Sequence, residues 1–369
     1  MRILYITLED LSLHKGSVTH VKEIVAGLRK QGHQVGLTGR RWNSIAFSSL
    51  FLLISLFGKL PQYDVIYARD YHTVIIALIP RLIFRKKLVF EINGLANEEQ
   101  KLKRYSYLNR LLVFIIKKAE GLATKYSEKI ISVTPRIATY LNKDFKCPLE
   151  KVVVIGNGVD IKRFYPVSDQ NLLGKWRDRW GIGKEDMVVV FVGNLARWQG
   201  VETFIESGFK LFQKNERLKF LIVGDGPLKE NLMKKVSESQ WKQRFIFTGM
   251  VNYEEIPFLI NIANICVAPF ISKRNQKTGV SPLKIFEYMA CGKPVVASRI
   301  QGLEFIEDEG VGCLIEPEDV ESLEKALYDL IKEPKKRIRM GQKGSQIARE
   351  NFSWESRVIE IEKVLKKLA

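Results

Sequence analysis

The sequence predicts an α/β protein made of two doubly wound domains. Short runs rich in β-branched and aromatic residues alternate with helical patterns, which indicates parallel strands joined by crossover helices. The alternation breaks once, over residues 156–183, and then repeats. A chain of 369 residues is long for one hydrophobic core and suits two domains. Because ligands of open α/β sheets sit at the carboxyl ends of the strands, we expect the chemistry at these ends.

Six strands are expected before the break. They are Arg2–Thr7, Gln34–Thr38, Val65–Ala68, Lys87–Ile92, Ile130–Val133 and Val152–Ile155. The helices expected between them are Val18–Lys30, Ile45–Phe57, Thr73–Ile83, Glu98–Lys118 and Arg136–Asn142. The apolar run 45–60 falls short of the roughly 20 residues that span a bilayer, so we expect a buried or interfacial helix there.

Six more strands are expected after the break. They are Val188–Val192, Phe220–Val223, Arg244–Thr248, Ile265–Ala268, Val295–Ala297 and Cys313–Ile315. The helices expected with them are Val201–Gln213, Leu228–Ser239, Glu254–Asn261 and Pro282–Ala290, followed by an amphipathic helix at Ser353–Ala369.

The charge of the chain is unevenly distributed. Residues 1–165 carry 27 Lys and Arg against 13 Asp and Glu, whereas the remaining residues carry 32 against 28. So basic an amino-terminal half indicates an anionic partner, such as acidic lipid headgroups or a lipid-linked diphosphate. Nucleic acid is not predicted as a partner, because no nucleic-acid-binding motif is present.

The cysteines and the first residues predict a cytoplasmic location. The four cysteines lack metal-ligand spacing, and Cys266 and Cys291 lie in apolar segments expected to be buried, which suits a reducing compartment. The apolar run Ile3–Ile6 followed by Glu9 and Asp10 is expected to be a first strand and not a signal peptide.

The segment 278–298 combines a polar loop, a helix expected to begin near Ser281 and a buried strand. The amino end of a helix presents unpaired N–H groups and suits an anion such as a diphosphate. Lys284 and Glu287 share one face near that end, so Lys284 can meet phosphate charge and Glu287 can accept hydrogen bonds from ribose hydroxyls. On spacing alone, a surface ion pair is an equal alternative.

The segment SPLKIFEYMACGKPVVAS resembles the donor-binding segment of the family 4 glycosyltransferases, retaining enzymes of the two-domain GT-B fold. MRILYIT, KGSVTHVKEIVAGLRKQGHQV, VIGNGVDIKRF, FVGNLARWQGVETFI, VGDGP and FTGMVNYEEIPFLINIANICVAPF match other landmarks of that family in order. The resemblance implies two Rossmann-like domains facing across a cleft. Residues 1–165, joined by helix 353–369, would bind the acceptor, and residues 166–352 would bind a nucleotide-sugar donor.

The resemblance also implies site residues. A catalytic role is expected for Asn93, Arg197 and Lys284. Donor contacts are expected from Gly16, Ser17, Asn194, Gln199, Gly226, Met250, Val251, Gly279, Val280, Ser281, Pro282 and Glu287. Asn93 stands where the family often has His, and it can hydrogen-bond a sugar hydroxyl, although Asn93-Gly94 also suits a strand-ending turn.

Three positions depart from the family pattern. Asn194 and Gln199 stand where basic residues are common, and Gly279 stands where a first glutamate is common. Arg197 and Lys284 are expected to supply the charge that these positions lack. No Asp-x-Asp motif is present, so no metal and no cofactor beyond the nucleotide diphosphate sugar is expected.

The function predicted is transfer of a sugar to a glycan or lipid-linked acceptor in cell-surface polysaccharide or glycoconjugate synthesis. Two alternatives remain open: a nucleotide-sugar 2-epimerase with the same architecture, and a non-catalytic nucleotide-sugar-binding partner of a membrane assembly. The basic and aromatic segment Lys101–Lys118 suits a membrane-surface helix, or a core-facing helix with a solvated basic face. With the basic half around it, we expect a peripheral protein on the anionic inner face of the membrane.

Overall fold

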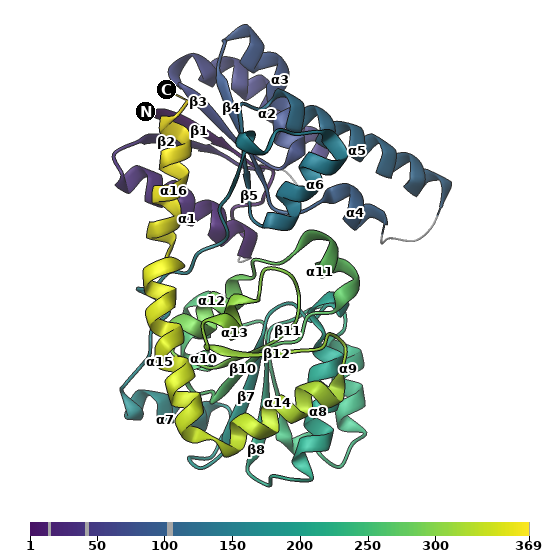
Figure 1. Cartoon of the computed structure of the whole chain (residues 1–369), viewed down its shortest axis with the longest axis vertical. Helices are drawn as coiled ribbons and strands as arrows, with labels where there is room; N and C mark the ends of the chain where they lie inside the picture. Colours follow the sequence, from purple (N-terminus) through teal and green to yellow (C-terminus); the bar gives the residue numbers. More distant parts are fainter. Residues whose placement is uncertain (14–15, 41–43, 102–105, 369) are drawn as a thin grey trace. The chain divides into compact units, whose positions relative to one another are not determined.

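The chain folds into two compact units, each of which is described by itself. The computed structural model describes residues 1–13, 16–40, 44–101 and 106–368 (Figure 1). Unit 1 comprises Met1–Gly158, Lys277–Ser281 and Trp354–Ala369. Unit 2 comprises Val159–Gln276 and Pro282–Ser353.

Unit 1 contains a six-stranded parallel sheet with the strand order β2-β1-β3-β4-β5-β6. The strands are β1 (Arg2–Ile6), β2 (Gln34–Thr38), β3 (Val65–Arg69), β4 (Lys87–Ile92), β5 (Lys129–Ser132) and β6 (Val152–Val154). All six predicted strands are present, and each boundary lies within one residue of its prediction. The strand order reverses between β1 and β3, so a ligand crevice is expected at the carboxyl ends of these two strands.

The helices of unit 1 flank this sheet. They are α1 (Gly16–Lys30), α2 (Ile45–Lys59), α3 (Tyr71–Ile83), α4 (Ala96–Lys101), α5 (Tyr107–Tyr126), α6 (Pro135–Phe145) and α16 (Trp354–Lys366), with short 3₁₀ turns η1 (Leu60–Gln62) and η2 (Leu149–Lys151).

The prediction of one helix over 98–118 was wrong. The described residues form two helices, and α5 has its own amino-terminal cap, because the Ser106 side chain accepts a hydrogen bond from the Asn109 N–H. Residues 102–105 of the predicted helix lie outside the described residues.

Unit 2 contains a second six-stranded parallel sheet with the order β12-β11-β10-β7-β8-β9. The strands are β7 (Met187–Val192), β8 (Leu218–Val223), β9 (Phe245–Gly249), β10 (Ile265–Ala268), β11 (Val295–Ser298) and β12 (Gly312–Ile315). The order reverses between β7 and β10, where the next crevice is expected. The strands read as continuous apolar runs because helices cover both faces of a parallel sheet.

The helices of unit 2 include several that the sequence prediction omitted. They are α7 (Gln170–Arg179), α8 (Val201–Phe212), α9 (Lys229–Ser237), α10 (Ile256–Asn261), α11 (Ser272–Thr278, which runs into the segment 277–281 of unit 1), α12 (Leu283–Ala290), α13 (Phe305–Asp308), α14 (Val320–Lys332) and α15 (Pro334–Asn351). The 3₁₀ turns are η3 (Arg197–Gln199), η4 (Lys242–Arg244) and η5 (Tyr253–Glu255). The omitted helices are α7, α11, α13, α14 and α15.

Both units have aromatic and aliphatic cores. In unit 2 the Phe204 and Phe220 rings stack with centroids 4.5 Å apart between α8 and the sheet. Cys266 and Cys291 are buried free thiols, as predicted.

Candidate active site

Lys284 lies in the first turn of α12 in unit 2. The amino-terminal cap residue of α12 is Pro282, which provides no side-chain hydrogen bond to the N–H groups of the first turn. The predicted start near Ser281 therefore shifts to Leu283. The Lys284 ammonium donates to Gln199 Oε1 at 2.7 Å and stands 4.1 Å from the centroid of the Phe191 ring.

The glycine at the end of β7 makes room for this ammonium. Gly193 has φ +145°, and a Cβ on it would lie 2.7 Å from Lys284 Nζ. A larger residue here would displace the ammonium. Burial lowers the pKa of Lys284 to about 7, against the opposing effect of the Glu287 carboxylate. A bound anion would restore the charge that burial disfavours.

Glu287 lies one turn further along α12 and is 6% exposed. Its Oε1 accepts a hydrogen bond from the Tyr253 hydroxyl at 3.0 Å. The Arg163 guanidinium lies over the Tyr253 ring, 4.8 Å from its centroid. Burial raises the pKa of Glu287 to about 7, although the Tyr253 hydrogen bond and the charges of Lys284 and Arg163 lower it.

Asn194 packs against the turn that follows β8. A Cβ on Gly226 would lie 2.3 Å from Asn194 Oδ1, and the Leu195 N–H donates to the Asp225 carbonyl at 2.9 Å. Only glycine permits this approach of the two loops at the carboxyl ends of β7 and β8. Asn194 itself is exposed there.

The remaining predicted residues of unit 2 lie on nearby loops. Arg197 is exposed at the start of η3, two residues before Gln199. Met250 is 75% exposed and Val251 is half-buried, both directly after β9. Within the described part of the chain, these three side chains make no hydrogen bond to Lys284 or Glu287, so their assignment to the site stays a prediction.

The predicted loop 279–281 belongs to unit 1, and hydrogen bonds hold it at both ends. Thr134 Oγ1 donates to the Thr278 carbonyl at 2.6 Å, and the Asn157 N–H donates to Ser281 Oγ at 2.9 Å. Gly279 adopts the left-handed conformation, with φ +65°. Val280 lies half-buried between these anchors. Pro282, the next residue, belongs to unit 2.

A buried carboxylate network at the carboxyl end of β4 was missed by the sequence analysis. We call Glu91 and its four hydrogen-bond donors the Glu91 network. The donors are His20 Nε2 at 2.6 Å, Asn93 Nδ2 at 2.6 Å, Tyr67 OH at 2.7 Å and Tyr5 OH at 3.3 Å. Glu91 is 1% exposed, and Arg69 Nε lies 3.5 Å from its Oε1.

His20 links the Glu91 carboxylate to Asn157. Its Nε2 faces the Glu91 carboxylate, and its Nδ1 lies 2.6 Å from Asn157 Oδ1. The Asn157 amide nitrogen donates to the Ser281 carbonyl, which fixes Oδ1 toward the ring. Both ring nitrogens therefore face acceptor oxygens.

Glu91 is an anion in this setting. Burial raises its pKa, but the charge and hydrogen bond of His20, the charge of Arg69 and the hydrogen bond of Asn93 outweigh burial and lower the pKa to about 2. The sequence signal that could have indicated this network is a glutamate inside the apolar strand 87–92. Its partners could not be predicted, because His20 and Asn157 lie far away in the chain.

Three further predicted residues of unit 1, Gly16, Ser17 and Asn93, lie on or directly after the elements that carry this network. Asn93 is half-buried, and its amide nitrogen is fixed by Glu91. Gly16 is exposed and Ser17 half-buried in the first turn of α1, which also carries His20. Residue 15 lies outside the described residues.

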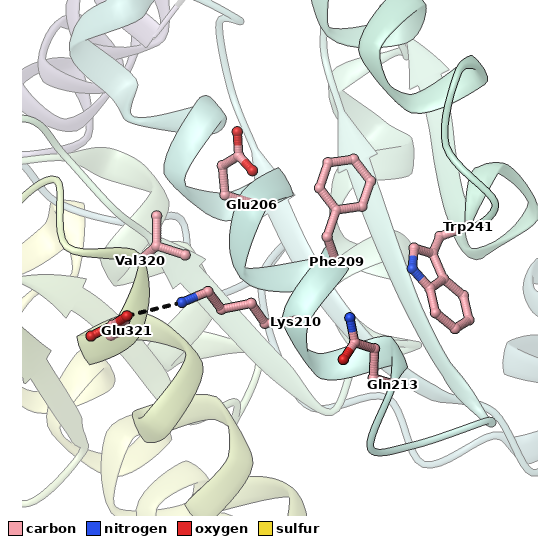
Figure 2. Close-up of a pocket in the computed structure, with 7 residues that line it drawn as sticks. All are labelled: Glu206, Phe209, Lys210, Gln213, Trp241, Val320 and Glu321. Atoms are coloured by element: carbon pink, nitrogen blue, oxygen red, sulfur yellow. Dashed lines mark hydrogen bonds and ion pairs between the residues drawn. The ribbon is translucent and has the colours of Figure 1, made fainter.

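A separate surface pocket lies in unit 2 beside α8 and the start of α14 (Figure 2). Its lining is Glu206, Phe209, Lys210, Gln213, Trp241, Val320 and Glu321. Lys210 pairs with Glu321 at 3.1 Å across it. None of the lining residues is a predicted donor residue, so the pocket does not bear on the candidate site.

Two family models match this chain. Residues 174–347 match the model described as glycosyl transferases group 1, and residues 36–163 match the model described as glycosyltransferase family 4. The chain belongs to this family of glycosyltransferases. The two matches span most of the chain, one largely in each unit, and they confirm the predicted family.

Two of the proteins similar to this chain are sugar transferases. Over 240 residues the glycosyltransferase is 26% identical to the alpha-D-kanosaminyltransferase of Streptomyces kanamyceticus, covering 65% of this chain and 60% of the relative. Over 203 residues it is 31% identical to the GDP-mannose-dependent alpha-(1-6)-phosphatidylinositol monomannoside mannosyltransferase of Mycolicibacterium smegmatis, covering 54% of this chain and 52% of the relative. The matches thus span less than two thirds of either relative.

Solved structures share the fold over the full chain. The sucrose-phosphate synthase of Thermosynechococcus elongatus is similar with a TM-score of 0.83 at 19% identity, covering 100% of this chain and 99% of that one. Anabaena HepE in complex with UDP is similar with a TM-score of 0.78 at 21% identity, covering 100% of both chains. The fold class is GT-B, as predicted.

Proposed function

We propose that this glycosyltransferase moves a sugar, with retention, from a nucleotide diphosphate sugar to a glycan or lipid-linked acceptor in cell-surface polysaccharide or glycoconjugate synthesis. The observation that carries the proposal is the pair Lys284 and Glu287 on one face of α12, each with a pKa shifted to about 7. Perturbed ionisable groups at the opening of a helix mark sites where a ligand supplies the missing partners. The structural relative HepE is described in complex with UDP and with UDP-glucose, which supports a nucleotide-sugar donor.

In this proposal unit 2 holds the donor. The first turn of α12, Lys284 and the exposed Arg197 neutralise the diphosphate, and no bound metal is required. Glu287 accepts hydrogen bonds from the ribose hydroxyls. Gly226 and Asn194 line the bottom of the donor site, and Gln199 holds the Lys284 ammonium in place. Met250 and Val251 contact the nucleotide base.

Unit 1 supplies groups for the sugar and the acceptor. The Asn93 amide nitrogen already donates to Glu91, so its carbonyl oxygen is the atom to accept from a sugar hydroxyl. The bond between the sugar and the diphosphate oxygen breaks, and the acceptor oxygen bonds to the sugar on the same face. The acceptor proton passes to the leaving diphosphate. Catalysis rests on positioning and on stabilising the leaving charge.

Product analysis separates this activity from its two alternatives. Thermal-shift screening with UDP, GDP, ADP and dTDP identifies the nucleotide, because ligands that bind the native state raise the melting temperature. The matching nucleotide sugars are then incubated with lipid and glycan acceptors. Acceptor-dependent release of nucleoside diphosphate supports the proposal. Interconversion of sugars without acceptor indicates the epimerase, and binding without either reaction indicates a non-catalytic partner.

We also propose that the protein works in the cytoplasm, peripherally on the anionic inner face of the membrane. The motive is the basic half 1–165, with Arg85-Lys86-Lys87 after α3 and the basic residues of α5. Each Lys or Arg near an acidic surface contributes about 1 kcal/mol. Flotation with phosphatidylglycerol vesicles tests this, and recovery that is equal on neutral vesicles, or absent on both, contradicts it.

A further inference from the structure

Three neighbouring helices of unit 1 leave large apolar side chains exposed. Helix α3 packs against both α2 and α5. The exposed side chains are Ile45, Phe47, Leu50, Ile54 and Phe57 on α2, Ile79, Leu82 and Ile83 on α3, and Tyr107, Leu108, Leu111, Leu112, Phe114, Ile115, Leu122 and Tyr126 on α5. We call this set the apolar platform. Scattered exposed hydrophobic residues are normal, but adjoining helices with this many mark an interaction surface.

Helix α2 is apolar around most of its circumference. The stretch Ile45–Gln62 is long and apolar enough to cross a membrane, and 22% of it is buried in the protein. Its buried stripe, Ser48, Leu52 and Leu56, faces unit 1, and Leu52 and Leu56 belong to the core there. The opposite face carries Phe47 and Ile54, which are 68% and 63% exposed. Because the core of unit 1 holds α2 along its length, a membrane that covers the outer face of α2 would lie parallel to the helix axis.

Helix α5 extends this surface. Its buried residues, Glu120, Ala123 and Thr124, are all in its last two turns. The amino-terminal half runs outward from the sheet (Figure 1), where Tyr107 is 85% exposed. The outer turns therefore present apolar and aromatic side chains without a core to bury them.

The charges on the three platform helices are almost all positive, and two of them are paired with neighbouring elements, Arg81 with Glu128 and Lys117 with Asp144. The sequences of α2, α3 and α5 contain one acidic residue, Glu120, which is buried. Lys118 and Lys125 lie 5.5 Å and 5.3 Å from the centroids of the Phe114 and Tyr126 rings. Aromatic rings beside lysines around an apolar face suit the boundary between headgroups and acyl chains. A second copy of this chain fits poorly, because a two-fold interface would face this positive surface with itself.

We propose that the apolar platform inserts in the plane of an anionic bilayer, with α2, α3 and α5 seated in the boundary between headgroups and acyl chains. The inference rests on the proposed peripheral location and goes beyond it. Charge alone would adsorb the protein at a distance, whereas the platform holds it through apolar contact.

The test is vesicle flotation of the full chain at low and high salt. The vesicles contain phosphatidylcholine with or without phosphatidylglycerol. The variants are Ile54→Glu on α2, Leu111→Glu on α5 and, as a matched control, Ile338→Glu, an exposed residue of unit 2. We expect wild type to keep part of its binding at high salt. Each platform variant should lose roughly tenfold or more in partitioning, as loss of one inserted side chain of this size gives, and the control should not change.

The outcomes distinguish failure of the insertion proposal from failure of the proposed peripheral membrane location on which it rests. Binding that high salt abolishes, with the platform variants equal to wild type, overturns insertion and leaves electrostatic docking intact. No binding to any vesicle overturns both proposals. Analytical ultracentrifugation adds a third outcome: a wild-type dimer that Ile54→Glu converts to monomer shows that a second copy covers the platform and overturns the proposal.

Discussion

Glu91 on β4 of unit 1 and Glu287 on α12 of unit 2 are both buried, and the two carboxyls behave in opposite ways. Glu91 in unit 1 and Glu287 in unit 2 are 1% and 6% exposed. The pKa of Glu91 is lowered to about 2, whereas that of Glu287 is raised to about 7. Burial raises both pKa values, so the difference comes from the groups that surround each carboxyl.

Hydrogen-bond supply explains the contrast. Glu91 accepts from His20, Asn93, Tyr67 and Tyr5, which leaves little for a ligand to add. Among the described residues, Tyr253 is the hydrogen-bond donor to Glu287. A carboxylate that the protein itself satisfies holds structure together. A carboxylate left short of donors is prepared for a ligand that brings them, such as a ribose with two hydroxyls.

The largest effect is expected for stability in unit 1. Glu91→Gln should lower the free energy of unfolding by about 3–5 kcal/mol, because it removes the buried anion that Arg69 and four hydrogen-bond donors face, and Arg69 then keeps only its partly exposed partner Glu9 among the described residues. Urea denaturation followed by tryptophan fluorescence near pH 7 measures it. Glu287→Gln is the control and should leave stability unchanged or slightly raised, since ionising Glu287 is unfavourable in the fold. Equal losses in the two variants would contradict the distinction.

Acid should act on the same carboxylate. Glu91 has a lowered pKa, so its stabilisation is complete above its ordinary pKa of 4.5 and is lost as pH falls from there toward about 2. A shift of this size corresponds to about 3 kcal/mol. We expect the free energy of unfolding of wild type to fall more steeply between about pH 5 and about pH 2 than that of Glu91→Gln. Parallel curves would show that Glu91 does not carry this dependence.

The next largest effect is expected on turnover, when a side chain that neutralises the diphosphate in unit 2 is removed. Charge-assisted contacts are worth roughly 1.5–3 kcal/mol, so Lys284→Ala and Arg197→Ala should each reduce turnover by about ten- to a hundredfold. Lys273→Ala, on the exposed face of α11, is the matched control and should change turnover little. Initial rates of nucleoside diphosphate release measure this. If all three variants behave alike, diffuse charge and not a defined pair handles the diphosphate.

The smallest effect is a pH dependence of nucleotide affinity. Binding to phosphate favours protonated Lys284, whose pKa is about 7, so affinity should fall as pH rises above 7. Binding to ribose favours ionised Glu287, so affinity should also fall as pH drops below 7. Titration calorimetry with the preferred nucleoside diphosphate should give an optimum near neutrality. Glu287→Gln should bind more weakly and lose the acid limb, and an unaltered curve removes Glu287 from the site.

The sheets were predictable from the sequence because their strands are continuous apolar runs. Runs such as Met187–Val192 leave few alternatives for a buried parallel strand. Helices were harder. The buried stripe Leu323, Leu327 and Leu330 of α14 carried a readable helical pattern that the prediction omitted. The polar helix α7 has no buried residue, so periodicity gave no signal there.

The candidate site was predictable only where neighbours in sequence are neighbours in space. Lys284 and Glu287 share a turn of one helix, so their pairing followed from spacing. Tyr253 reaches Glu287 from another element, and His20 reaches Glu91 from a helix 71 residues away. Such partners depend on how the sheet orders its strands, which local patterns do not encode.

The discontinuity of unit 1 has a consequence for synthesis on the ribosome. Helix α16 packs on α1, where a Cβ on Gly27 would lie 2.5 Å from the Val358 side chain. Trp354 meets the His20 ring edge-on at 5.2 Å, and Glu362 binds His33 at 2.9 Å. These contacts come from residues translated after all of unit 2. During synthesis, the face of α1 that packs against α16 therefore stays uncovered until α16 has left the exit tunnel and can pack on it.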